Sequence, residues 1–416
     1  MVSDVSRPAT LAGASWLKEE KLRAVLDALD AKGGATRIVG GAVRNALFDA
    51  PVGDIDLATI FLPAQVIKRA QAAGLKTAPT GIEHGTVTVI ASGTPFEVTT
   101  LRTDVETDGR RAVVAFTQDW LEDARRRDFT INALYCDGQG TIFDPLGGLA
   151  DVTARRVRFI GNAEERIAED YLRILRFFRF FAWYGHGRPD PGGLKAVTRL
   201  KDGLAGLSAE RVWAEIKKLL AAPDPARALL WMRTTGIVQS VLPESWGIDA
   251  IHRLVAAERT ENWPADPLLR LEAMLPPDAG KVAALANRLK LAKAEARRLS
   301  AWAKAPEPDA GLSETALAAR LYRHGAEAVR DRLAHGFARA AQAGNQVDAV
   351  AFGKQISFAE NWRKPVFPLK GKDLLAAGMK AGPAVGKRLK ALEEAWVEGG
   401  FAGDKQALLD GLDEQD

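Results

Sequence analysis

Up to about Asp144, the chain alternates short apolar runs with stretches of helical spacing. Residues 37–39 (Arg-Ile-Val), 86–90 (Thr-Val-Thr-Val-Ile) and 95–100 (Pro-Phe-Glu-Val-Thr-Thr) are rich in β-branched residues, and Gly or Pro residues lie beside them. Such runs predict strands, because β-branched side chains favour extended backbone. We therefore expect a mixed α/β region at the N-terminal end.

From about Ala150 onward, the pattern becomes helical. Ala, Leu, Arg and Glu recur at helical spacing, and Pro clusters at 223–225, 264–267, 276–277 and 306–308 interrupt them. The sequence thus predicts an α+β chain. A domain with a mixed β-sheet comes first, and the last two-thirds are nearly all helix.

The composition fits a globular chain and excludes several classes of protein. The 416 residues are 47% hydrophobic and 26% charged, which predicts about two to four domains. No apolar run approaches the ~18 residues that a membrane span needs, and residues 1–20 lack the order of a signal peptide. We expect a cytoplasmic protein that does not enter a membrane.

Cysteine and histidine usage limits the metal chemistry. One cysteine, Cys136, allows neither an internal disulfide nor a thiolate zinc site, and the five histidines show no paired spacing. Any metal must therefore bind carboxylates.

The net charge of +4 conceals a strong segregation of charge along the chain. Residues 1–147 carry −3, residues 148–222 carry +5, residues 353–390 carry +7 and residues 391–416 carry −7. A local basic excess is typical of proteins that bind the phosphate backbone of nucleic acids, although a solvated helix face gives the same pattern.

Residues 37–48 predict a strand, a tight Gly40-Gly41 turn and the start of a helix. Glycines in such a turn let backbone N–H groups approach a phosphate, and the helix N-terminus adds partial positive charge. Arg44, one turn into the helix, can bind the same oxygens through its forked guanidinium. The alternative is that the glycines serve only the backbone geometry of the turn.

A pair of aspartates follows in residues 51–58 (Pro-Val-Gly-Asp-Ile-Asp-Leu-Ala). Asp54 and Asp56 are two residues apart, so on a strand they share one face. Two carboxylates this close repel each other, and a divalent cation compensates them; oxygen ligands without His or Cys suit Mg²⁺. Glu97, on a neighbouring predicted strand, could be a third ligand or an exposed strand residue, and we leave it out of the metal site.

Taken together, these motifs resemble a known family. Gly40-Gly41-Ala-Val-Arg44, Gly53-Asp54-Ile-Asp56, Pro79-Thr-Gly81-Ile-Glu-His84-Gly85-Thr86 and Arg126-Arg127-Asp128-Phe-Thr-Ile-Asn132 follow one another in the chain. The ordered set is similar to the class II tRNA nucleotidyltransferases, which are the bacterial CCA-adding enzymes and their poly(A) polymerase relatives in the polymerase β superfamily. The likeness spans residues 37 to about 220, and a weaker one continues to the C-terminus.

The stretch from Glu164 to Phe181 predicts one amphipathic helix. At about 100° per residue, Asp170 and Arg173 are neighbours on the face opposite an apolar stripe. They could form a surface ion pair, or together present an acceptor and a donor to a nucleobase edge. The resemblance implies the second role: Asp170 and Arg173 would read the incoming C or A, Glu169 would support the helix turn, and Arg176 and Arg179 would extend the basic face.

The resemblance also implies the reaction and its participants. Gly41 and Arg44 would hold the triphosphate, Arg127 and Asp128 the sugar and phosphates, and two Mg²⁺ ions on Asp54 and Asp56 would promote transfer from CTP and ATP. The partners would be the tRNA 3′ end and the tRNA body, with no protein partner indicated. We expect a nucleotidyltransferase head (1–147), a base-recognition neck (148–222), a helical body (223–345) and an RNA-binding tail (346–416).

Two further segments have expected roles. Residues 101–118 are polar and predict a loop, which the resemblance connects with the switch from C to A addition through Asp104 and Arg110. Residues 365–397 predict two short helices joined by a Gly382-Pro383-x-x-Gly386 turn. Their cations, including Lys387, Arg388 and Lys390, would grip the tRNA body, or the helices would simply cap the bundle.

Several alternative functions remain open at this stage. A poly(A) polymerase shares the head chemistry but carries a more basic segment in place of residues 79–86. A CC-only or A-only enzyme shares all these motifs. A small-molecule nucleotidyltransferase has no evident need for the long helical region or the +7 segment, and a catalytically inactive RNA-binding protein is disfavoured because the aspartates and the Arg-Arg-Asp motif are present.

Overall fold

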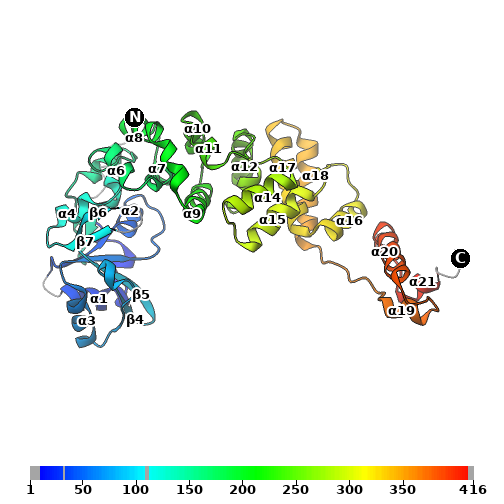
Figure 1. The fold of residues 1–416 in the computed structure, drawn as a ribbon, viewed down its shortest axis with the longest axis horizontal. Coiled ribbons are helices and arrows are strands. Elements are labelled where there is room, and N and C mark those ends of the chain that lie inside the picture. Colours follow the sequence, from blue (N-terminus) through cyan, green and yellow to red (C-terminus); the bar gives the residue numbers. More distant parts are fainter. Residues whose placement is uncertain (1–9, 31–32, 108–111, 411–416) are drawn as a thin grey trace. The chain divides into compact units, whose positions relative to one another are not determined.

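A computed structural model describes residues 10–30, 33–107 and 112–410 (Figure 1). The chain divides into two compact units. The first comprises Met1–Leu219 and Arg227–Val241, and the second comprises Leu220–Ala226 and Leu242–Asp416. Each unit has its own architecture. Among the described residues, no helix combines the length and the apolar character that crossing a membrane requires.

The first unit contains a seven-stranded mixed sheet, as the sequence predicts. Only the β2–β5 pair is parallel, and the other neighbours in the sheet are antiparallel. The parallel register places Asp56 beside Glu97, and the antiparallel register places Val39 beside Asp56. The strands, in their order across the sheet, are β3 (Lys76–Ala78), β4 (Thr86–Ala91), β5 (Thr94–Thr100), β2 (Asp56–Thr59), β1 (Thr36–Val39), β8 (Tyr135–Cys136) and β9 (Ile142–Phe143).

Amphipathic helices cover this sheet. In α1 (Glu20–Asp30) the buried residues are Leu22, Val25, Leu26 and Leu29, the spacing of one helix face. This helix packs on α3 (Pro63–Ala72) and on β4. Helix α2 (Gly41–Leu47) begins one residue after the end of β1, with Gly40 between them.

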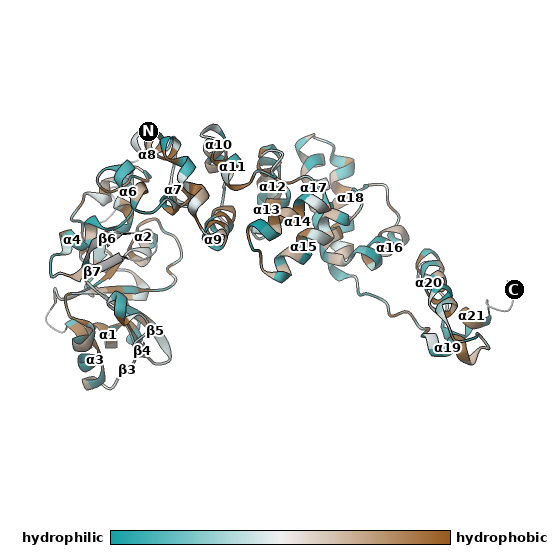
Figure 2. Ribbon diagram, viewed as in Figure 1, coloured by the Kyte–Doolittle hydropathy of each residue, from teal (hydrophilic) through white to brown (hydrophobic). Residues whose placement is uncertain are grey.

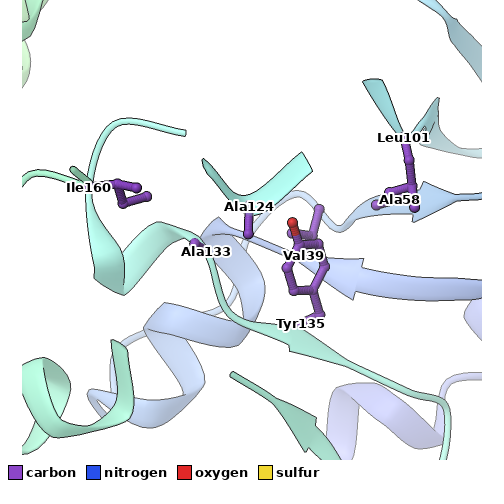
Figure 3. Packing of buried hydrophobic residues seen from close by; sticks show 7 residues of the cluster. All are labelled: Val39, Ala58, Leu101, Ala124, Ala133, Tyr135 and Ile160. Carbon is purple, nitrogen blue, oxygen red and sulfur yellow. The ribbon is translucent and has the colours of Figure 1, made fainter. Parts of the chain in front are cut away.

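A small apolar cluster fixes the strand ends that carry the predicted site (Figure 3). Val39 at the end of β1 and Ala58 in β2 pack with Tyr135 of β8 and with Ala124 of α4 (Trp120–Arg125). Because Val39 directly precedes the glycine turn and Ala58 follows Asp56 by two residues, this packing sets where both motifs lie.

The segment predicted as a loop, residues 101–118, forms a hairpin instead. Strands β6 (Arg102–Thr107) and β7 (Ala112–Phe116) pair antiparallel as a separate two-stranded sheet. Val105, Val113 and Val114 are β-branched residues that favour strands, but the many polar residues of the segment outweighed them in the prediction. Arg110 lies outside the described residues.

The rest of the first unit is helical, as predicted, but the single helix expected from Glu164 to Phe181 is two helices. Between them Asp170 has extended backbone (φ −155°, ψ 106°). The helices are α5 (Gly148–Thr153), α6 (Ala163–Glu169), α7 (Leu172–Tyr184), α8 (Pro191–Arg199), α9 (Ala209–Leu220), α10 (Ala226–Thr234) and α11 (Ile237–Val241), with short 3-10 turns at Ser15–Lys18, Ile82–His84, Thr130–Asn132 and Lys201–Gly206.

Helices also make up the described part of the second unit, and all four Pro clusters fall at breaks or helix starts, as predicted. Figure 2 shows teal and brown residues sharing the same ribbons, as in amphipathic helices. The helices are α12 (Asp249–Thr260), α13 (Pro267–Glu272), α14 (Ala279–Arg288), α15 (Lys293–Lys304), α16 (Glu314–His324), α17 (Ala326–Gln342), α18 (Gln346–Asn361), α19 (Gly371–Ala376), α20 (Pro383–Glu398) and α21 (Lys405–Asp410).

The tail differs in one respect from its prediction. Pro383 is the first residue of α20, so Gly386 lies inside a 16-residue helix rather than in a turn. Proline suits this position, since its missing N–H would have no partner in the first turn. The α20 helix is anchored to α16 by a cluster of Ala319, Trp396 and Val397.

Candidate active site

A cleft of about 480 Å³ in the first unit collects most of the predicted site residues. Its walls come from the end of β1, the glycine turn, β2, β5, the stretch around Arg127, and helices α7 and α9. Of the predicted residues it includes Gly41, Arg44, Asp56, Arg127, Asp128, Asp170, Arg173 and Arg176; the other lining residues are Val39, Gly40, Leu57, Glu97, Thr99, Arg102, Arg126, Asn132, Leu172, Phe180 and Arg211.

The glycine turn has the geometry that the sequence predicts. Gly40 has φ +68°, a conformation that disfavours side chains, and it directly precedes α2. A Cβ atom on Gly40 would lie 3.6 Å from Arg127 Nη1. The turn therefore lies against an arginine of the cleft wall, and its backbone is open to a close approach.

Carboxylates from two parallel strands meet at the cleft. Asp56 begins β2, and its neighbour across the ladder is Glu97 of β5. Partial burial raises the pKa of Asp56, the charges of Glu97 and Asp54 raise it further, and Arg127 opposes them. Asp54 is exposed, two residues before Asp56, and is not among the residues that line the cleft.

This acidic group fits a divalent cation. Desolvation is the main cause of the raised pKa of Asp56, and the neighbouring Glu97 and Asp54 carboxylates add repulsion that a cation would relieve. Within the described ranges, His, Cys, Asp and Glu side chains form no set of three or more able to hold a metal by themselves. An open site with few protein ligands suits Mg²⁺, which keeps water and phosphate oxygens in its shell.

Arg44 lines the cleft but is held tightly by the protein. Its guanidinium donates to Asn132 Oδ1 (2.5 Å), Asn45 Oδ1 (2.9 Å) and the Tyr184 hydroxyl (3.0 Å). It also stacks over the rings of Phe180 and Tyr184. Burial lowers its pKa, and Tyr184 opposes the effect. Arg44 thus ties α2 to α7 as well as facing the site.

Arg126 and Arg127 share one buried anion, Asp123. Asp123 Oδ1 accepts from Arg126 Nε (2.9 Å), and Oδ2 accepts from Arg127 Nη2 (3.0 Å) and the Tyr135 hydroxyl (2.8 Å). Burial alone would raise the pKa of Asp123, but Arg127 and Arg126 lower it to about 2. The Asp123 carboxylate is therefore ionised at neutral pH.

Buried Asp128 pairs with Arg176, whose side chain is partly exposed. Arg176 Nε donates to Asp128 Oδ2 (2.7 Å), and Asn132 Nδ2 donates to Oδ1 (2.8 Å). Burial would raise the pKa of Asp128, yet Arg176 and the hydrogen bonds lower it. Arg179, predicted on the same basic face, donates to Glu215 Oε2 (2.6 Å) and is not among the cleft-lining residues.

Asp170 and Arg173 both line the cleft, but each has its own partner rather than forming the ion pair considered from the sequence. Asp170 Oδ2 accepts from Arg211 Nη2 (2.6 Å), and Oδ1 accepts from the Leu172 amide (3.1 Å). Arg173 Nη1 donates to Glu169 and to the Arg166 carbonyl (2.6 Å). The helix break at Asp170 places these two residues next to each other while their charges are balanced separately.

The predicted RNA-binding residues lie in the second unit. Lys387, Arg388 and Lys390 are on α20, where Lys387 and Lys390 are exposed and Arg388 is half-buried. Asp104, predicted in a loop, lies in strand β6.

Sequence reasoning missed several residues that line the cleft or bind its arginines. Asp123 precedes the Arg-Arg-Asp motif by three residues and could have been read as its i, i+3 and i, i+4 partner. Arg211 gave no such signal, because its partner Asp170 is 41 positions away. Asn132 belongs to the quoted motif, but its contact with Arg44, 88 positions away, could not be predicted from the sequence. Glu97 was considered and left out, whereas the structure places it at the cleft beside Asp56.

Comparison with known proteins gives consistent matches over most of the chain. Residues 36–158 match the family model described as "Poly A polymerase head domain", and residues 189–247 match "Probable RNA and SrmB- binding site of polymerase A". The mitochondrial CCA tRNA nucleotidyltransferase 1 of Mus musculus is 34% identical over 380 residues, which is 90% of this chain and 85% of the mouse protein.

Bacterial proteins match to a similar extent. The CCA-adding enzyme of Limosilactobacillus fermentum is 33% identical over 393 residues, covering 94% of this chain and 95% of that protein. The crystal structure of the Bacillus stearothermophilus CCA-adding enzyme in complex with CTP superimposes with a TM-score of 0.75 at 31% identity, over 95% of this chain and 96% of that one.

Proposed function

This chain belongs to the CCA-adding enzyme family of tRNA nucleotidyltransferases, and on that premise we propose that it adds C, C and A to the 3′ end of tRNA from CTP and ATP. The observation that supports this most directly is the content of one cleft. Groups suited to transfer (Asp56), to phosphate binding (the Gly40-Gly41 turn, Arg127) and to base recognition (Asp170, Arg173) all line it.

Asp56, which lines the cleft, and Asp54, two residues before it, would hold two Mg²⁺ ions. When bound, the ions supply Lewis-acid chemistry: they lower the pKa of the RNA 3′ hydroxyl and stabilise charge on the departing pyrophosphate. Asp56 keeps its place because β2 is fixed on both sides in the sheet, by β1 and by β5. Glu97, next to Asp56 in the ladder, adds negative charge that favours cation binding.

The triphosphate would lie along the glycine turn. Gly40 and Gly41 allow the backbone of the turn to approach the phosphate oxygens, and Arg127 Nη1 lies against the same turn. Guanidinium groups bind phosphate oxygens through paired hydrogen bonds. Arg44 and Arg176 add positive charge to the wall, and Asp128 would contact the sugar from its position between Arg176 and Asn132.

Asp170 and Arg173 would choose the base. Cytosine and adenine both present an amino group beside a ring-nitrogen acceptor, so a carboxylate and a guanidinium can bind that edge together. Uracil and guanine present a carbonyl where the amino group would be, which leaves Asp170 without a donor. Arg173 engages Glu169 and a backbone carbonyl through Nη1, so its orientation is set before a nucleotide binds.

Outside the cleft, Lys387, Arg388 and Lys390 would bind the phosphate backbone of the tRNA body. The matches to poly(A) polymerase domains concern segments, whereas the relatives that match nearly end to end are CCA-adding enzymes. This extent of match favours CCA addition over poly(A) synthesis. The cytoplasmic location expected from the sequence stays a prediction, since the mouse relative is a mitochondrial protein.

The roles of the two aspartates can be tested by removing each carboxylate. Asp54→Ala and Asp56→Ala should abolish nucleotide addition to a tRNA that lacks its 3′ CCA, while tRNA affinity measured by filter binding stays close to that of the wild type. Asp27→Ala, which removes an exposed carboxylate from α1 outside the cleft, is the matched control. Nucleotide addition by the Asp54→Ala/Asp56→Ala double variant would contradict the proposal.

A further inference from the structure

Asp123 is a buried carboxylate whose three side-chain donors leave neither of its oxygens without a partner. It lies on α4, is 1% exposed and is not itself among the residues that line the cleft. Its side chain accepts from Arg126, Arg127 and the Tyr135 hydroxyl. Two of these donors, both arginines, belong to the cleft wall.

A third arginine holds the backbone carbonyl groups of Arg126 and Arg127. Arg166 of α6 donates to the carbonyl oxygens of both Arg126 and Arg127. The backbone carbonyls are thus held by the helix that leads to Asp170, and the guanidinium groups by Asp123. Arg127 Nη1 then lies 3.6 Å from the Cβ position of Gly40.

Holding these groups in place matters for binding a triphosphate. A long arginine side chain loses rotamer freedom when a ligand orders it, and two adjacent guanidinium groups repel each other. A buried anion between them removes both obstacles before a ligand arrives, so the ligand does not have to order the arginines itself.

We propose that Asp123 is a positioning residue for nucleotide transfer, which fixes the guanidinium groups of Arg126 and Arg127 in the cleft wall, with Arg127 beside the glycine turn where the phosphates of an incoming nucleoside triphosphate would bind. The proposal rests on the function proposed above and adds a residue that contacts neither nucleotide nor RNA. It assigns Asp123 to the phosphate end of the cleft and not to base choice.

The test is Asp123→Asn, which keeps the shape of the side chain and removes its charge. Binding of CTP and ATP, measured by calorimetry in the presence of Mg²⁺, should weaken on the order of 10- to 100-fold, and kcat/KM for addition should fall with it. The preference for CTP over UTP should not change, because Asp170 and Arg173 are untouched. A merely structural role would not separate these two readouts.

The chain offers a matched control in Asp151. This carboxylate is also fully buried and also binds two arginines, Arg156 and Arg158, but none of the three lines the cleft. Asp151→Asn should bind CTP like the wild type once the folded fraction, measured by circular dichroism, is taken into account. Equal losses in the Asp123→Asn and Asp151→Asn proteins would overturn the proposal.

A double-mutant cycle tests whether Asp123 acts through Arg127. Arg127→Lys keeps the charge but loses the forked contact, so adding Asp123→Asn to it should cost much less than Asp123→Asn alone. Full additivity would refute the proposed route. If Asp123→Asn does not fold, Tyr135→Phe replaces it: losing one donor should weaken CTP binding several-fold, and unaltered binding would overturn the proposal.

Measuring CTP binding also distinguishes a failure of the role of Asp123 from a failure of the proposed CCA addition. A wild-type protein that binds CTP but extends no tRNA would contradict CCA addition and leave the binding test of Asp123 valid. A wild-type protein that adds CCA, with Asp123→Asn equal to it in CTP affinity, would contradict only the role of Asp123.

Discussion

At the scale of single residues, the cleft contains charged groups that are oriented by partners on other elements. Asp170 is held by Arg211 of α9 and Arg173 by Glu169 of α6. Each member of the expected base-reading pair therefore has its own counter-charge. Base choice can then depend on hydrogen-bond direction at Asp170 and Arg173, without a contribution from their mutual attraction.

Loss of the Arg173 guanidinium should reduce discrimination among nucleotides more than it reduces the rate of addition. In Arg173→Ala, the preference for CTP and ATP over UTP and GTP should fall by about tenfold or more, since one paired contact contributes ~1–3 kcal/mol of discrimination. The measurement is kcat/KM for each of the four nucleotides on a tRNA ending before its CCA.

Arg199→Ala is the matched control for this prediction. Arg199 is an arginine of α8 that pairs with Glu164 outside the cleft, and its loss should leave nucleotide preference intact. Unchanged selectivity in the Arg173→Ala protein would count against the template role.

Residue pairs show where sequence reasoning succeeds and where it stops. The glycine turn and Asp56 could be located because short local patterns specify them. The partners of Asp170 and Arg44 could not, since the chain must first fold to bring residues 41 and 88 positions apart together. Charge spacing alone suggested an Asp170–Arg173 pair, which the structure replaces with two separate pairs.

At the scale of elements, α20 is the helix that the proposed function assigns to RNA. Its first half carries Lys387, Arg388 and Lys390, and its second half carries Glu393, Glu394 and Glu398. The acidic half has partners on α16: Tyr322 donates to Glu393, and Arg323 pairs with Glu394 and Glu398. These contacts give part of the acidic C-terminal segment a structural use, and they do not involve the basic residues that we propose bind phosphate.

Replacing Lys387, Arg388 and Lys390 together with Ala should weaken tRNA binding and its dependence on salt. Each lost phosphate contact lowers the slope of log K against log salt concentration by about 0.7 to 0.9. KM for tRNA should therefore rise, while the KM for CTP stays near that of the wild type.

The acidic half of α20 supplies the control. Glu398→Gln removes one exposed charge from the same helix without removing a cation, so it should leave the salt slope unchanged or slightly steeper. A triple variant with the wild-type slope would refute the role of α20 in RNA binding.

Elements were predicted well where one periodicity runs through a whole segment, and poorly where a local side-chain contact interrupts it. Strands β1, β4 and β5 and the helix-breaking Pro clusters followed directly from their patterns. The helix break at Asp170 was missed because residues on both sides of it keep helical spacing, while Leu172 N–H bonds to the Asp170 side chain and gives the backbone an alternative to the helix.

At the scale of the whole molecule, the residues proposed for catalysis and those proposed to bind the tRNA body lie in different units. The first unit contains the cleft with its carboxylates and arginines, including the residues proposed to read the base. The second contains α20 with its exposed lysines. Segregated charge in the sequence already indicated this division, with −3 on residues 1–147 and +7 on residues 353–390.

The central claim is that this cleft builds the sequence CCA on tRNA, and sequencing of new 3′ ends tests it most directly. The protein is incubated with Mg²⁺ and CTP, ATP or both, on tRNA lacking CCA, on tRNA ending in CC and on an unstructured RNA. We predict CCA on the first substrate with both nucleotides, CC with CTP alone and a single A on the second, with little extension of the third. Long A tracts, or equal extension of the unstructured RNA, would contradict the account.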